Sequence, residues 1–128
     1  DRNISRLIDI TGDPNLIVFE HNLEDGSDWP FSEEKFDGII VTNYLYRPLF
    51  DHLVSALAEG GILLYQTFAE GNAAYGKPRS PAFLLKENEL LDKFGQHLDI
   101  LDFGQGYVDQ PNPSVVQRIC CRKPHFND

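Results

Sequence analysis

Two short apolar segments separated by an amphipathic stretch constrain the fold of this chain more than any other feature. Residues 38–41 (Gly-Ile-Ile-Val) and 62–65 (Ile-Leu-Leu-Tyr) are almost continuously apolar, which is typical of parallel strands covered on both faces. Between them, apolar residues recur at helical spacing, namely Leu49, Phe50, Leu53, Ala56 and Leu57. The pattern predicts a strand, a crossover helix, a turn at Gly60-Gly61 and a second strand, which together form a βαβ unit.

Strands connected in this way bind ligands at their carboxyl ends. Thr42-Asn43-Tyr44 follows the first strand, and Gln66-Thr67-Phe68 follows the second. We therefore expect the functional site at this edge of the sheet.

The other elements follow from periodicity and from turn residues. We expect a short helix at Ile4, Leu7 and Ile8, a buried strand at 16–19, a loop at 69–81, a helix at 87–94, and strands at 98–103 and 115–121 joined by a turn-rich connection at 104–113. Because the last connection contains no helix, the final two strands should be antiparallel. The order predicts one α/β domain over residues 1–128.

Charge and composition exclude several classes of function. The chain has 20 acidic and 11 basic residues, for a net charge of −9, and such a surface repels nucleic-acid phosphates. No apolar run approaches the roughly 20 residues of a membrane span, so we expect no membrane partner and a cytoplasmic location. Histidines, cysteines and carboxylates share no ligand spacing, so no metal site is expected. Cys120 and Cys121 are adjacent and should point to opposite faces of a strand as packing residues.

The order and spacing of these segments resemble the later two-thirds of a class I S-adenosylmethionine (SAM)-dependent methyltransferase, in particular the small bacterial enzymes related to tellurite-resistance methyltransferases. The likeness lies in Asp1–Asn3, Asn22–Gly26, Phe36–Asn43, Leu57–Leu63, Phe83–Leu85 and Glu89–Leu91. It covers the entire chain and implies a Rossmann-like sheet, mostly parallel, with an antiparallel C-terminal strand pair. It also implies SAM as the cofactor and methyl transfer to a small-molecule acceptor.

The resemblance further implies cofactor-binding roles for residues at strand ends. Asp1 stands where the family carries an acidic residue for the ribose hydroxyls, and a carboxylate can accept from two hydroxyls at once. Asn22 and Leu23 stand where the family contacts adenine. Thr42 and Asn43 would face the methionine portion of the cofactor.

Tyr44 and Tyr75 are the candidate contacts for the methyl acceptor; Tyr75 lies in the 69–81 loop, whose length is typical of binding loops. No catalytic residue is assigned, because methyl transfer depends mainly on alignment in a dry pocket. If the acceptor has a proton to lose, His21, Tyr44 or Tyr75 would be the bases.

Structural interpretations of some of these residues stay open. Asn22 also fits a turn residue, and Asn43 also fits a cap for the next element. Arg47 fits either a solvated side chain or a contact for an anionic group.

The family's first strand, glycine-rich loop and first helix are missing, and no strand-GxGxxG-helix arrangement occurs. The chain has no methionine and begins at Asp1, so we expect that a further upstream segment belongs to the protein. In the family the first strand lies at the centre of the sheet, so residues 16–19 should have no direct neighbour here. A second copy that filled this gap would make a homodimer.

Two alternative functions stay open. One is a non-catalytic methyltransferase-like binding or assembly module, or a fragment. The other is a fragment of a nicotinamide-binding Rossmann domain.

Overall fold

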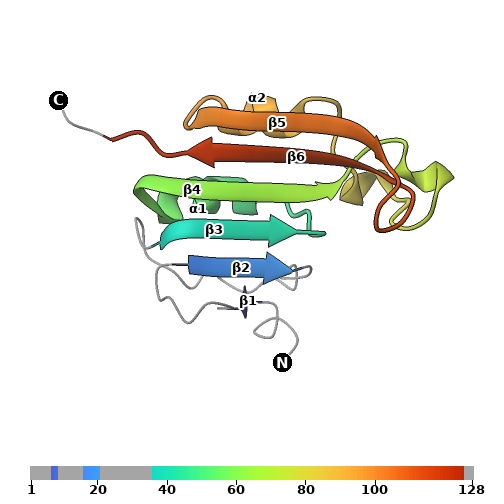
Figure 1. Ribbon diagram of the computed structural model, residues 1–128, viewed down its shortest axis with the longest axis horizontal. Helices are drawn as coiled ribbons and strands as arrows, with labels where there is room; N and C mark the ends of the chain where they lie inside the picture. The colour runs from blue at the N-terminus through green and yellow to red at the C-terminus, as the bar shows by residue number, and fades with distance from the viewer. Residues whose placement is uncertain (1–6, 9–15, 21–35, 126–128) are drawn as a thin grey trace.

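The computed structural model describes residues 7–8, 16–20 and 36–125, with side chains from residue 36 onward. These residues form a six-stranded mixed sheet with helices α1 and α2 packed on one face, as Figure 1 shows. The strands are β1 (Leu7–Ile8), β2 (Leu16–Glu20), β3 (Phe36–Thr42), β4 (Leu57–Phe68), β5 (Asp99–Val108) and β6 (Ser114–Arg122). The helices are α1 (Leu49–Ala56) and α2 (Glu89–Phe94), with 3₁₀ turns η2 (Asn72–Ala74) and η3 (Pro81–Phe83).

The sheet has the order β1-β2-β3-β4-β6-β5. Strands β2, β3, β4 and β5 point in the same direction, whereas β1 and β6 run opposite to them. The predicted α/β sheet with an antiparallel C-terminal pair is therefore confirmed, because β5 and β6 are antiparallel.

The predicted βαβ unit is β3-α1-β4. The two strands pair in parallel from Gly38 opposite Ile62 to Thr42 opposite Gln66. Alternate residues point toward α1 and are fully buried, as at Ile39 and Leu63. The apolar stripe of α1 packs on them through Leu49, Phe50, Leu53 and Ala56, all buried.

The glycine pair is not a turn between α1 and β4, as its position predicts, but a kink inside β4. The strand begins at Leu57, directly after the helix. Gly60 has φ of +79°, a left-handed backbone that favours glycine. At Gly61 an added Cβ would lie 2.8 Å from the Ala58 carbonyl oxygen and 3.1 Å from that of Phe36, so the backbones approach too closely for a side chain.

Lys123 connects this kink to the end of α1. Its backbone N–H donates to the Gly61 carbonyl (2.9 Å), and its carbonyl accepts from the Gly60 N–H (2.7 Å). Its Nζ donates to the carbonyl oxygens of Val54 and Leu57, each at 3.0 Å. A buried cation thus binds the last carbonyls of the helix, where the helix dipole favours positive charge.

Three further expectations were wrong, each because backbone pairing extends the sheet. Leu7 and Ile8 form strand β1 against β2 rather than a helix, since three apolar residues are a weak helical signal and the edge of β2 offers unpaired backbone groups. Residues 104–108 belong to β5 rather than to a connection. Strand β2 does have a direct neighbour, because it pairs in parallel with β3.

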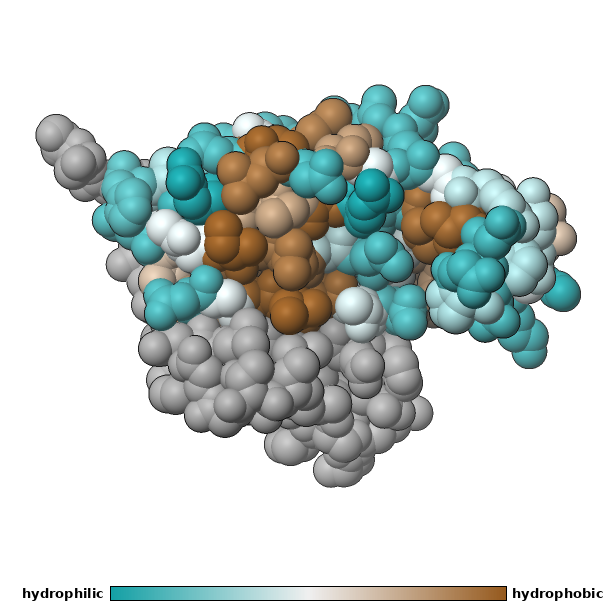
Figure 2. Space-filling view, in the orientation of Figure 1, coloured by the Kyte–Doolittle hydropathy of each residue, from teal (hydrophilic) through white to brown (hydrophobic). Residues whose placement is uncertain are grey.

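The sheet face opposite α1 and α2 carries several apolar side chains. Ile62 and Leu64 alternate with the buried Leu63 and Tyr65, and 42% of Leu64 is exposed. Cys120 is half-buried and Cys121 fully buried, both as free thiols on opposite faces of β6, as predicted. Figure 2 shows the apolar area on the sheet face opposite α1 and α2.

No described helix is long and apolar enough to cross a membrane.

The close approach at Gly61 predicts that Gly61→Ala lowers the free energy of unfolding by about 1–3 kcal/mol, because the methyl group must displace backbone carbonyls. Gly76→Ala is the matched control, because nothing lies within 4 Å of a Cβ at that position. Urea denaturation monitored by circular dichroism measures both. Equal stability of the two variants would contradict the close approach.

Candidate functional site

The carboxyl end of β3 lies beside Gln66 of β4 and presents polar side chains. The expectation that Gln66-Thr67-Phe68 follows the second strand was wrong, because β4 continues to Phe68 through its pairing with β6. Thr42 pairs with Gln66, and the parallel ladder continues one residue further because the Asn43 N–H donates to the Gln66 carbonyl at 3.0 Å. Thr42 is half-buried, and Asn43 and Gln66 are exposed. The structure therefore places these three polar residues at neighbouring backbone positions of this edge of the sheet.

Asn43 ends β3 through its backbone conformation. Its φ of +54° is in the left-handed region, which asparagine tolerates better than most residues. The chain reverses there, and the next residue, Tyr44, is 2% exposed. The interpretation of Asn43 as a helix cap is wrong, because α1 follows Pro48 and has no side-chain cap.

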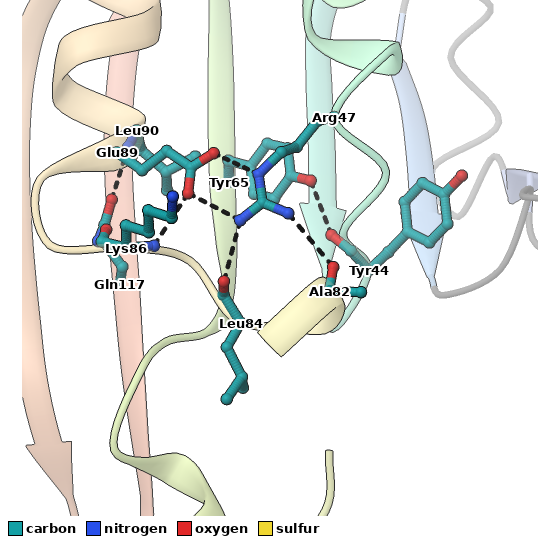
Figure 3. A network of polar contacts seen from close by, with 9 residues as sticks. All are labelled: Tyr44, Arg47, Tyr65, Ala82, Leu84, Lys86, Glu89, Leu90 and Gln117. Carbon is teal, nitrogen blue, oxygen red and sulfur yellow. Dashed lines mark hydrogen bonds and ion pairs between the residues drawn. The ribbon is translucent and has the colours of Figure 1, made fainter. Parts of the chain in front are cut away.

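The carbonyl of Tyr44 accepts a hydrogen bond from a residue in the core of the domain. The Tyr65 hydroxyl donates to it at 2.7 Å, as Figure 3 shows. Tyr65 is 1% exposed, and burial raises the pKa of its hydroxyl well above the usual range. The hydroxyl therefore keeps its proton and remains a donor at all physiological pH values.

Arg47 connects the turn after β3 to the elements that follow β4. Its guanidinium binds both carboxylate oxygens of Glu89, with Nη2 2.9 Å from Oε1. It also donates to the carbonyl oxygens of Leu84 (2.9 Å) and Ala82 (3.3 Å). Figure 3 shows these contacts converging on the guanidinium. Arg47 is thus only partly exposed, and the anionic group that it contacts is the carboxylate of Glu89. Through these contacts it holds η3 and α2 against the turn after β3.

Glu89 is kept ionised by this arrangement. Burial alone would raise the pKa of Glu89, but hydrogen bonds from Arg47 and from the Lys86 backbone N–H outweigh burial and lower this pKa below its usual value. The carboxylate remains a full partner for the guanidinium at neutral pH.

Tyr75 lies apart from the Thr42–Tyr44 segment. Its ring is 5.1 Å from that of Tyr107 on β5, at an interplanar angle of 49°, and about half of each side chain is exposed. Three strand spacings separate β3 from β5, or roughly 14 Å. The role of Tyr75 with the acceptor stays a prediction. The sequence did not indicate its contact with Tyr107, because residues 104–108 were expected in a connection and not in β5.

Asp1, His21, Asn22 and Leu23 lie outside the described residues, so their predicted roles stay predictions. Within the described ranges, no group of three or more histidine, cysteine or carboxylate side chains is placed to hold a metal ion. The side chains of His52, His97 and His125 are exposed.

No protein-family model and no curated protein matches the sequence. Solved structures do match. A SAM-dependent methyltransferase from Methanosarcina mazei is 14% identical, with a TM-score of 0.59 over 76% of this chain and 63% of that chain. TehB from Haemophilus influenzae is 18% identical, with a TM-score of 0.53 over 73% of this chain and 37% of that chain. The [4+2]-cyclase SpnF is 16% identical, with a TM-score of 0.56 over 76% of this chain and 53% of that chain.

These likenesses show the fold. The described sheet is the Rossmann-like sheet of SAM-dependent methyltransferases, as the sequence predicts. The chain spans less than two thirds of the length of these structures. Because SpnF is named for a cyclisation, the fold by itself does not fix the reaction.

The Arg47–Glu89 contact predicts a pH-dependent contribution to stability. At pH 7, Glu89→Gln should lower the free energy of unfolding by about 1–2 kcal/mol. The pKa of Glu89 is lower in the folded state than the roughly 4.3 of an unfolded glutamate, so the contribution is full above that value and is lost as pH falls through the folded pKa. Denaturant titrations from pH 7 to pH 3 measure this change.

Glu87→Gln is the matched control, because Glu87 is exposed and lies just before α2. Its effect on stability should be small at every pH. A Glu89→Gln defect that stays constant down to pH 3 would contradict the role of the carboxylate.

Proposed function

We propose that the protein binds SAM at the carboxyl edge of β3 and β4 and transfers its methyl group to a small-molecule acceptor. The observation that carries the proposal is the polar edge formed by Thr42, Asn43 and Gln66, at the position where open α/β sheets bind their ligands. The methyltransferase fold supports it.

The chemistry of these side chains fits the methionine portion of SAM. That portion carries an ammonium, a carboxylate and a sulfonium, and the Thr42 hydroxyl and Asn43 amide can each donate and accept hydrogen bonds. The net charge of −9 also favours encounter with a cofactor whose net charge is positive. Asp1, Asn22 and Leu23 complete the proposal as contacts for the ribose and adenine.

The reaction sets a condition on the acceptor. The methyl group leaves the sulfonium, which becomes a thioether, and forms a bond to the lone pair of a nucleophilic atom, which must lose any proton that it carries. Within the described part of this edge, Thr42, Asn43 and Gln66 carry no group that titrates near neutral pH. The acceptor therefore binds already deprotonated, or passes its proton to water or to a group outside these residues, such as His21.

A second candidate function is a methyltransferase-like module that binds SAM or another small molecule without methyl transfer. It is supported by the likeness to SpnF, which is named for a cyclisation and not for methyl transfer. The methyltransferase and the SAM-binding form of the module share the same edge and the same cofactor, so cofactor binding tests the site before activity separates these two functions.

Isothermal titration calorimetry of the protein with S-adenosylhomocysteine (SAH), the product of methyl transfer, tests the site. We expect saturable binding, and we expect Asn43→Gly to raise Kd about tenfold, because glycine keeps the left-handed backbone and removes the amide. Asn88→Gly is the matched control, since Asn88 also has a left-handed backbone, with φ of 62°, but precedes α2. It should leave Kd unchanged.

NADH serves as the control ligand, because a fragment of a nicotinamide-binding domain was the other interpretation of the sequence. We expect NADH to give no heat of binding. Binding of NADH without binding of SAH would replace the proposal with that interpretation. Absence of SAH binding at millimolar ligand would reject both SAM-based functions.

A further inference from the structure

The Tyr65 hydroxyl is a polar group in the centre of an aromatic cluster. The Tyr65 ring lies 5.7 Å from the ring of Phe50, edge to face, and 6.1 Å from that of Phe94. Phenylalanine would make the same ring contacts. The feature that distinguishes tyrosine here is its hydrogen bond to the Tyr44 carbonyl, at 2.7 Å.

That carbonyl lies within the turn that follows β3. At the start of the turn the Asn43 N–H is bound to the Gln66 carbonyl at 3.0 Å. At its end the N–H groups of Leu49 and Phe50 bind the carbonyls of Tyr46 and Arg47. Between these two ends, the Tyr65 hydroxyl holds the Tyr44–Leu45 peptide, which begins one residue after Asn43.

The backbone conformation of Asn43 links the contact between Tyr65 and Tyr44 to the orientation of the Asn43 side chain. The left-handed backbone of Asn43 is tolerated by asparagine but is less favourable than a right-handed one, so the fixed position of its neighbour Tyr44 helps to maintain it. If the Tyr44 carbonyl loses its buried donor, it must turn toward water or toward another donor. Such a rotation of the Tyr44–Leu45 peptide would change the backbone of Tyr44, to which Asn43 is directly bonded, and would thereby release the orientation of the Asn43 amide.

We propose that Tyr65 is a positioning residue for the cofactor site, which it serves through the Tyr44 carbonyl without touching the ligand. The inference rests on the proposed function, since it assigns to Tyr65 the orientation of the Asn43 amide toward SAM. Tyr65 comes from β4, so the strand that pairs with β3 also fixes the turn from inside the core.

Tyr65→Phe tests the assignment, because it removes the hydroxyl and keeps the ring. We expect Kd for SAH, measured by calorimetry, to rise about tenfold. The control is Ile119→Val, a loss of one methylene from a core residue that is 3% exposed and belongs to β6. It should lower stability to a similar degree and leave Kd for SAH unchanged.

A role in stability alone would give equal Kd values for both variants and the wild type, or equal losses of affinity in both variants; either result would overturn the inference. A second measurement separates this failure from failure of the proposed function. Amide hydrogen exchange of the 42–48 segment should be faster in Tyr65→Phe than in the wild type and in Ile119→Val, with no ligand present. If exchange there is unchanged, Tyr65 does not position the turn, whether or not the wild type binds SAH.

Discussion

The parallel register of β3 and β4 is the constraint on which the rest of the structure depends. It places Thr42 opposite Gln66 at the end of β3 and sets Ile39 beside Leu63 beneath α1. Strand β4 is also the partner of β6, so one strand joins the βαβ unit to the antiparallel end of the sheet. A shift of one residue would turn the buried faces of β3 and β4 toward water, so burial and the polar edge are fixed by the same pairing.

Polar contacts attach the elements that follow β4 to this central pair. Gln117 is fully buried on β6; its carbonyl oxygen accepts from the Leu90 N–H at 2.6 Å and its amide donates to the Lys86 carbonyl at 2.9 Å. Asn72 similarly binds the Val115 N–H and the Pro78 carbonyl. These side chains satisfy backbone groups at the start of α2 and in the preceding loop, which apolar packing alone would leave unpaired.

Local patterns in the sequence predicted the central unit and α2, because each has an apolar stripe or run of sufficient length. Local patterns failed where pairing with another strand decides the structure, as at Leu7 and Ile8. They also failed where glycines lie within a strand, as at Gly60 and Gly106. The contacts of Arg47 with Glu89 and of Tyr65 with Tyr44 join residues 42 and 21 positions apart. No spacing rule in the sequence identifies such partners, although Thr42, Asn43 and Tyr44 were placed correctly at the end of a strand.

The fold, the polar edge at the end of β3 and the buried support beneath that edge together underlie the proposal that this edge binds the methionine portion of SAM. Titration of the ¹⁵N-labelled protein with SAH, followed by two-dimensional NMR, tests this claim most directly. The account predicts that the largest chemical-shift changes fall on Thr42, Asn43, Tyr44 and Gln66. Changes confined to β5, β6 and α2, with these four amides unmoved, would contradict it.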